Sequence, residues 1–390
     1  MLRTLRVVLL FAPLLALLVP LLTPGTGGAL PLWSRKYELK CTDCHLAFPR
    51  LNDFGMKFKQ NGYRMKDEDG ESPWEAKEFP FSAIVNVGAA WDRIDTLDTS
   101  TNQRGSRTES GFKRNAVEFH AAGTLAPRVS FHVDADFSND TDNLEAGTAF
   151  VQLDDLVKGG ALNLKGGVYD ADIPYLASSR TTTLADYLSP VTLDATGIEL
   201  NGTSSKWTYA AGLINSSRDR LNGSPTSGSF NQLENVYAWL MHDFRGQLVA
   251  ARIYLDQQDP RKPSASSSQH LQAEISAYLN RARWFVIPGY TYQQFDDQPA
   301  VGVTDKHHTT LLEGMAWLDK ASRWALTARW ELEHIEKNSA APVQDNQLEA
   351  VDLGYYWNPN LKLGLDWTHT GDNVGGEKLD EIQALAHLGF

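Results

Sequence analysis

The chain has only two cysteines, which lie three positions apart and are followed at once by a histidine, in Cys41-Thr42-Asp43-Cys44-His45. Two thiols at this spacing can form thioethers to the vinyl groups of one porphyrin, and the adjacent histidine then lies under the iron. A thioredoxin-like pair would need a surrounding βαβ pattern, and a zinc site would need four ligands; this sequence shows neither. The motif therefore predicts one covalent haem c, attached through Cys41 and Cys44, with His45 as proximal ligand.

The residues just after the motif indicate a short helix. Leu51, Phe54 and Phe58 recur at helical spacing and form one apolar face. We expect this helix to begin near Pro49 and to end at Asn61-Gly62. Its apolar face is predicted to pack on the haem and to tune its reduction potential by excluding water.

Two thioethers near this helix are candidates for the sixth iron ligand. Met65 follows the helix and is free to fold back toward the iron, whereas Met56 lies within the helix. A methionine ligand would raise the reduction potential. We favour Met65, and five-coordinate or histidine-ligated iron remains an alternative.

The N-terminus is typical of an exported protein. Arg3 and Arg6 precede an apolar stretch at 7–22 that two prolines interrupt, and small residues follow at 25–29. This is the layout of a signal peptide, predicted over residues 1–29 with cleavage near Ala29. A membrane-anchor helix is disfavoured by the prolines and by the short span.

Composition narrows the class of protein. The formal net charge of −12 argues against a nucleic-acid-binding protein. Beyond the N-terminus, no apolar run is long enough for a membrane-spanning helix. There is also no Gly-rich phosphate loop, HExxH or GxSxG motif, so hydrolytic and nucleotide chemistry are not indicated.

From about residue 79 onward the sequence alternates between apolar and polar residues, as in 129–137 and 324–332. Segments of about 10 residues with this period are typical of a transmembrane β-barrel, whose strands are apolar outside and polar inside. The sixteen strands expected are 81–91, 112–124, 128–138, 146–155, 161–169, 194–203, 206–214, 232–244, 246–257, 269–280, 283–295, 308–319, 323–335, 346–357, 361–370 and 380–390.

The connections between these strands alternate between short turns and long polar loops. The long loops include 92–111, 170–193, 215–231 and 258–268. The last strand ends on Phe390, which resembles an outer-membrane insertion signal. A soluble β-sandwich or solenoid would not alternate its loops in this way. The sequence therefore predicts a mainly β protein: a 16-stranded antiparallel outer-membrane barrel over 79–390, preceded by a small α-helical monohaem cytochrome segment over 30–78.

The alternation also predicts which side chains face the barrel lumen. Carboxylates among them would concentrate a divalent cation by focusing the electrostatic potential. We expect no preformed metal site from spacing alone, and we place His307-His308 at the end of a loop. The predicted inward-facing residues are Glu118, His120, His132, Asp134, Asp136, Arg329, Glu331, Glu333, Asp366 and Thr368.

Four motifs occur in a fixed order: PLWSR at 31–35, CTDCH at 41–45, PRLNDFG at 49–55 and FKQNGY at 58–63. Together they resemble the N-terminus of the fused monohaem cytochrome–porins of the bacterial outer membrane, whose best-known members oxidise extracellular Fe(II). Trp33 stands where that family has Phe, and Glu38 where it has Gly.

The resemblance implies an outer-membrane electron-transfer porin, an Fe(II):cytochrome c oxidoreductase. Its implied partners are extracellular Fe(II) or another redox donor or acceptor, a periplasmic cytochrome and outer-membrane lipid. The segment 30–78 would plug or line the lumen from the periplasmic side. Two alternatives remain open: an outward conduit for respiratory electrons, and a solute-selective porin with a haem-bearing plug.

Overall fold

In the computed structural model, the regular structure covers almost all of the predicted strands and the haem-motif segment. The structure describes residues 32–47, 50–65, 81–98, 103–138, 144–171, 183, 185, 187, 188, 194–214, 235–257, 269–296, 304–337, 343–358, 361–373 and 378–389. The predicted signal peptide, residues 66–80 and Phe390 lie outside these described residues.

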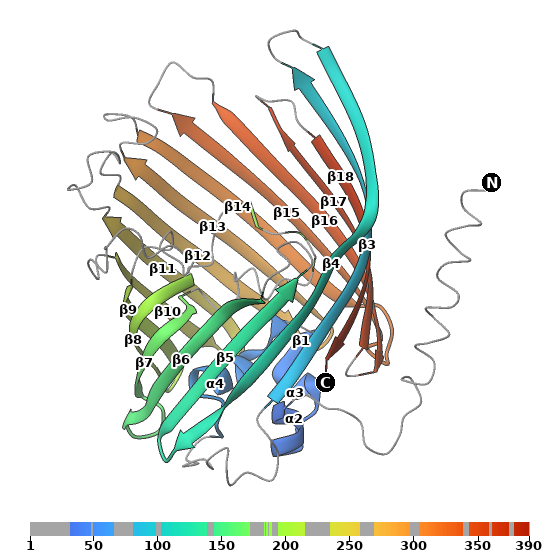
Figure 1. The fold of residues 1–390 in the computed structure, drawn as a ribbon. Helices are drawn as coiled ribbons and strands as arrows, with labels where there is room; N and C mark the ends of the chain where they lie inside the picture. The colour runs from blue at the N-terminus through green and yellow to red at the C-terminus, as the bar shows by residue number, and fades with distance from the viewer. Residues whose placement is uncertain are drawn as a thin grey trace.

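Sixteen antiparallel strands close into one barrel, in which each strand pairs with its neighbours in sequence and β18 pairs with β3 (Figure 1). The strands are β3 (Phe81–Asp98), β4 (Gln103–Ala126), β5 (Val129–Ser138), β6 (Leu144–Val157), β7 (Leu162–Asp170), β8 (Asp194–Ser204), β9 (Trp207–Ile214), β10 (Asn235–Phe244), β11 (Gln247–Gln257), β12 (Gln269–Arg281), β13 (Trp284–Asp296), β14 (Thr304–Trp317), β15 (Trp324–Lys337), β16 (Gln344–Asn358), β17 (Leu361–Asp372) and β18 (Lys378–Gly389).

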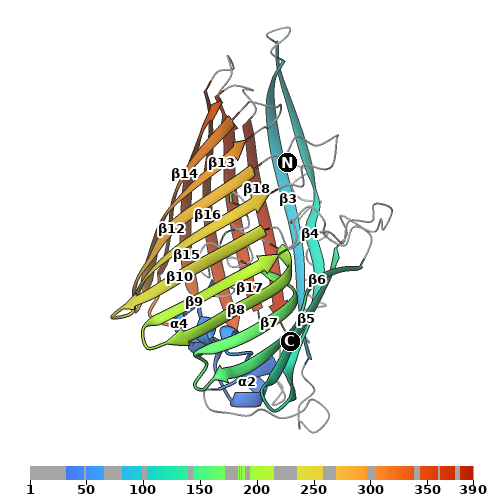
Figure 2. The same ribbon diagram turned by 90° about the vertical axis from the view of Figure 1, so that its left-hand side faces the viewer.

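Every predicted strand is present, but one predicted loop is wrong. The segment 92–111 is mostly strand, because β3 and β4 stay paired up to Asp98 and Gln103. This hairpin rises above the rest of the rim (Figure 2). Its residues lack an apolar face, since they extend past the part of the wall that faces lipid, and the alternation that marks the other strands is therefore missing here.

The two faces of the barrel wall differ as predicted. In β15, Trp324, Leu326 and Trp330 are exposed on the outer face, whereas Thr327 and Arg329 are buried on the inner face. The other predicted inward-facing residues are likewise buried or half-buried. An apolar outer face and a polar inner face are what a transmembrane barrel requires.

Aromatic side chains are exposed on the outer face near both ends of the strands. Next to the short turns lie Trp207, Phe244, Trp284, Trp324 and Trp357. Nearer the long-loop end lie Trp91, Phe112, Phe137 and Trp367. Two such girdles flank the apolar band of outer-membrane barrels, since aromatic rings favour the membrane–water interface.

The segment before the barrel forms three short helices and a small hairpin: α2 (Leu32–Tyr37), α3 (Cys41–Cys44), β1 (His45–Ala47), β2 (Arg50–Leu51) and α4 (Asp53–Gln60). None of the helices in the described part of the chain is long and apolar enough to cross a membrane. We call the described residues from 32 to 65 the plug, because Figures 1 and 2 place α4 inside the barrel and α2 at its mouth, at the end that carries the short turns.

The helix predicted from Pro49 begins later than expected. Arg50 and Leu51 instead pair with Ala47 and His45 in the β1–β2 hairpin. Asn52 then caps α4, and its side chain accepts a hydrogen bond from the backbone of Gly55. An asparagine cap satisfies a backbone donor that the first helical turn leaves unpaired, so it defines the start of the helix. The predicted end at Asn61-Gly62 is confirmed.

Candidate functional site

Asn52 ties the Cys41–His45 motif to helix α4. Its backbone N–H donates to the carbonyl of Cys44 at 2.9 Å, and its side-chain amide donates to the carbonyl of Asp43 at 2.9 Å. The same side chain accepts from Gly55 N at 2.9 Å. One residue therefore caps α4 and holds the turn that carries the cysteines.

Gly55 allows α4 to lie directly on that turn. A Cβ atom at this position would overlap the Cys44 carbonyl and would come within 3.0 Å of Cδ2 of Leu51. Any larger residue would push α4 away from the motif. The glycine in the PRLNDFG motif thus has a packing role beside Cys44, one of the two predicted haem-attachment cysteines.

An aromatic cluster joins α2 to α4 inside the plug. The Trp33 ring stacks on Tyr63 with centroids 4.3 Å apart, and Phe58 meets both rings edge-on. Tyr37 packs edge-on against Phe58 at 5.6 Å, and its hydroxyl donates to the Tyr63 carbonyl at 3.4 Å. The aromatic residues of the motifs thus form the core of the plug.

The predicted haem residues lie on this scaffold. Cys41 and Cys44 begin and end the single turn of α3, and His45 follows directly in β1. The two cysteines are thus three residues apart on one helical turn, the spacing that attachment to a single porphyrin requires. This donor set, held by Asn52 and Gly55, fits haem c.

The two candidate sixth ligands differ in their surroundings. Met56 is 3% exposed, within the hydrophobic cluster of the plug and wall. Met65 is half-buried and packs against the same cluster. Its backbone carbonyl accepts a hydrogen bond from the Asn61 side chain at 3.4 Å. The role of Met65 as an iron ligand stays a prediction.

A buried ion pair anchors the plug to the β14 side of the barrel. The Arg50 guanidinium donates to Glu313 at 2.5 Å, and both side chains are almost completely buried. Burial alone would lower the pKa of Arg50, but the Glu313 carboxylate and the Tyr187 hydroxyl raise it above its ordinary value. The Arg50 guanidinium therefore stays charged inside the lumen, and it also lies 5.5 Å from the ring centre of Phe285.

A second anchor joins the plug to β5 and β6. Arg64 pairs with Asp154 at 3.4 Å and with Asp155 at 3.1 Å. Close by, Gly62 has a φ of +66°, and a Cβ there would overlap the Ser130 hydroxyl. Glycine adopts this left-handed conformation without strain. The plug backbone consequently reaches the wall itself.

Described residues of the predicted loop 170–193 lie against the inner wall. Ala185 O accepts a hydrogen bond from Arg329 at 2.5 Å, and Leu188 N donates to Glu331 at 3.0 Å. The Tyr187 ring lies 4.5 Å from the Arg329 guanidinium, and its hydroxyl is 3.4 Å from Arg50. This part of the loop thus enters the lumen and contacts the plug.

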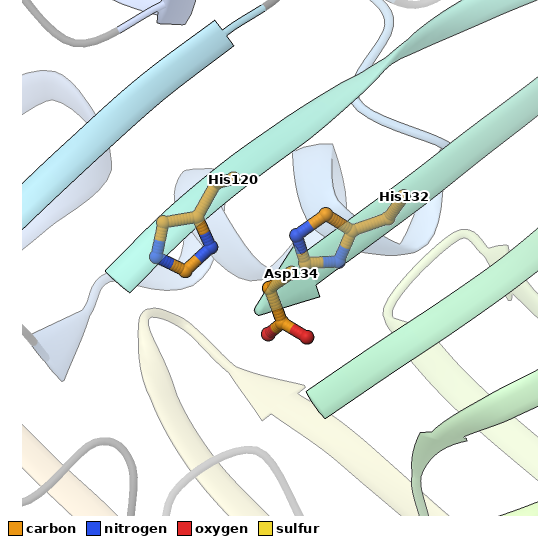
Figure 3. A group of neighbouring side chains, drawn as sticks. All are labelled: His120, His132 and Asp134. Carbon is orange, nitrogen blue, oxygen red and sulfur yellow. The ribbon is translucent and has the colours of Figure 1, made fainter. Parts of the chain in front are cut away.

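Beside the plug, the wall brings together His120 of β4 with His132 and Asp134 of β5 (Figure 3). One ligand atom from each lies within 4.8 Å of the others. The expectation of no preformed cluster is therefore wrong, because strand pairing sets His120 opposite Asp134. The alternation identified all three as inward-facing, but spacing within one strand does not reveal the register between two strands. His307-His308, expected at a loop end, lies within β14.

No protein-family model matches the chain, and no curated protein matches it. Solved structures similar in fold include an outer-membrane channel and an anion-selective porin. The outer-membrane channel DcaP of Acinetobacter baumannii has a TM-score of 0.59 at 11% identity, with 80% of this chain and 96% of that chain covered.

An anion-selective porin from Comamonas acidovorans has a TM-score of 0.55 at 9% identity, with 80% of this chain and 98% of that one covered. OmpF of Salmonella typhi, in complex with daunomycin, has a TM-score of 0.53 at 12% identity, with 79% of this chain and 97% of that chain covered. At such low identity the likeness concerns the fold. With the apolar outer face of the wall, it confirms the predicted 16-stranded barrel and the outer-membrane location.

Proposed function

We propose that this protein is an outer-membrane electron-transfer barrel, whose plug carries one covalent haem c and exchanges electrons between an extracellular donor and a periplasmic cytochrome. The observation that carries the proposal is the position of the Cys41–His45 motif. It lies on a plug that two sets of buried ion pairs hold inside the barrel, at the end with short turns. Such turns face the periplasm in outer-membrane barrels.

The hydrocarbon core of a bilayer is about 30 Å thick, and this distance is the main obstacle to electron transfer across it. A redox site inside the barrel shortens the distance that an electron must cross in one step. Haem c supplies a reversible one-electron carrier when it is bound. Cys41 and Cys44 would hold it covalently, and His45 would ligate the iron. Asn52 and Gly55 keep the motif against α4, and the aromatic cluster around Phe58 limits access of water, which tunes the potential.

Fe(II) is the donor that we propose, by resemblance to the fused cytochrome–porins. The inner wall supports a cationic donor, since buried or half-buried carboxylates of β14–β17 project into the lumen. They include Glu333 and Asp366, together with Glu313, Glu331 and Asp352, which are paired with Arg50, Arg329 and Lys362. Grouped carboxylates attract a divalent cation and raise its local concentration. A periplasmic cytochrome would meet the plug at the short-turn end.

A solute-selective porin is the second candidate. It has direct support from the comparisons, since the similar structures include a protein described as an anion-selective porin. A polar lumen within sixteen strands suits that function also. On this account the plug would restrict or sense the passage of solutes instead of carrying electrons.

The test is anaerobic titration of the oxidised, purified holoprotein with Fe(II), followed in the haem absorption bands, beside conductance in planar bilayers. Electron transfer predicts reduction of the haem by Fe(II) and a low conductance. The solute-porin account predicts a large conductance that removal of the haem leaves unchanged. A haem that stays oxidised in excess Fe(II) would overturn our proposal.

A further inference from the structure

We infer that His120, His132 and Asp134 form a binding site for one divalent first-row transition-metal cation in the barrel wall beside the plug. The binding of a cation follows from the wall itself. Its identity as the ferrous donor rests on the proposed function.

The three residues present a compact donor set. Their ligand atoms lie within 4.8 Å of one another, and the two imidazole rings are nearly parallel, with centroids 5.9 Å apart. Ligands about 2.1 Å from one ion in a tetrahedral site lie about 3.4 Å apart. Side-chain rotations that shorten the separations by up to about 1.4 Å would therefore bring all three onto one cation.

The strand register fixes these positions before any ion binds. His120 pairs with Asp134 across the β4–β5 ladder, and His132 is the next inward-facing residue of β5. The β5–β6 ladder shifts its register between Val133 and Ala135, so Asp134 lies at a bulge. Bulges redirect side chains and are common next to functional sites.

The carboxylate of Asp134 contacts the backbone of the neighbouring strand β6. One of its oxygens accepts a hydrogen bond from the Thr148 backbone. A Cβ atom at Gly147 would overlap that same oxygen. Gly147 thus leaves room for the carboxylate, and Thr148 orients it.

A buried imidazole nitrogen gives an independent indication of a ligand. His132 is 7% exposed, and its Nε2 has no hydrogen-bond partner among the described residues. Burying such a nitrogen without a partner carries a desolvation penalty. A cavity of about 50 Å³ lies against His132, Thr148 and Met56, between plug and wall. It is large enough to admit a water molecule or a small ion.

The donor set selects the class of cation. Two imidazoles and one carboxylate suit iron, cobalt and zinc, whereas Ca²⁺ and Mg²⁺ prefer sites made of oxygen ligands. Glu118 lies beside the site, with Oε2 3.6 Å from Nε2 of His120, and offers a further carboxylate. On the other side, the Tyr63 hydroxyl lies 3.5 Å from Nδ1 of His132, so the site borders the plug.

The test is zinc binding by the purified full-length holoprotein, stripped with a chelator and dialysed against Zn²⁺. We expect about one bound zinc per chain and, by X-ray absorption at the zinc edge, two imidazole ligands. His132→Ala and Asp134→Asn should each weaken binding by at least about tenfold. Gly147→Ala should also weaken it, since it displaces the carboxylate without removing a ligand.

His369→Ala is the matched control, because this strand histidine bonds Asp380 at 2.8 Å on the outer face. It should bind zinc like the wild type. Heat-modifiable mobility and haem staining show whether each variant folds. If His132→Ala does not fold, zinc binding by Asp134→Asn and Gly147→Ala still tests the inference. Wild-type protein that binds no zinc, or variants that bind as the wild type does, would overturn the inference. The Fe(II) titration fails or succeeds separately, since zinc binding requires no electron transfer.

Discussion

The wall at β4–β6 and the opposite wall at β11–β17 satisfy their inner charges in different ways. In β11–β17, basic side chains pair with acids of the same wall: Arg252 with Glu274, Arg329 with Glu331 and Lys362 with Asp352. On β6, Asp154 and Asp155 pair with Arg64, which the plug supplies. The plug thus supplies the cation for the β6 acids, whereas in β11–β17 it supplies one to Glu313, and the three pairs named above lie within the wall.

The two walls also differ in the regularity of their strand pairing. Register shifts interrupt each pairing from β3–β4 to β6–β7, whereas the pairings from β7–β8 to β15–β16 run without one. A regular ladder keeps strict alternation, and a bulge re-aims individual side chains. The irregular wall therefore carries the His120–Asp134 cluster and the Arg64 anchor of the plug, whereas the Arg50 anchor lies on the regular wall at β14.

The largest effect should come from removing the haem attachment while leaving the wall intact. In the Cys41→Ala/Cys44→Ala variant we expect no covalent haem and no reduction by Fe(II), because the chain has no other cysteines. The barrel should still insert, since strand pairing does not involve α3. Haem staining on denaturing gels and heat-modifiable mobility measure the two outcomes. Normal haem staining would contradict the assignment.

The next effect concerns the anchor between the plug and the β14 side. Arg50→Ala leaves Glu313 buried without its cation, and breaking such a pair costs about 3–5 kcal/mol. We expect plug docking to weaken by this order while the barrel keeps its stability. Hydrogen exchange of plug peptides, read by mass spectrometry, gives the free energy of opening. Unchanged protection in this variant would show that Arg50 does not hold the plug.

The sequence allowed the wall to be predicted almost strand by strand, because alternation is a local property of each segment. Features that depend on contacts between distant segments were not predictable in this way. The hairpin that delays α4 to Asp53, the loop contacts at Tyr187 and the pairing of His120 with Asp134 all depend on register or docking. The Cys41–His45 motif was visible because its residues are adjacent.

A smaller effect is expected at the predicted sixth ligand. Met65→Ala should lower the reduction potential, because a thioether favours reduced iron. Met56→Ala should have less effect on the potential, although Met56 is the more deeply buried of the two. Redox titration measures both, with about 59 mV for each tenfold change in the one-electron equilibrium. If only Met56→Ala lowers the potential, the ligand assignment moves to Met56.

The smallest effect should come from Lys57→Ala, a control for the Arg50 anchor. Lys57 pairs with Asp53 at 2.7 Å within α4, and both side chains are about one-third exposed. Pairs of this kind contribute about 0.3–0.5 kcal/mol. Hydrogen exchange of the plug should hardly change. A loss as large as that of Arg50→Ala would remove the distinction between buried anchors and solvated pairs.

The most direct test of the account is electron transfer across a membrane. Vesicles with the holoprotein in the bilayer would enclose oxidised soluble cytochrome c, and Fe(II) would be added outside under anaerobic conditions. We predict reduction of the enclosed cytochrome with the wild type, and none with Cys41→Ala/Cys44→Ala. Equal rates for the two proteins, or no reduction with the wild type while its own haem is intact, would contradict the central claim.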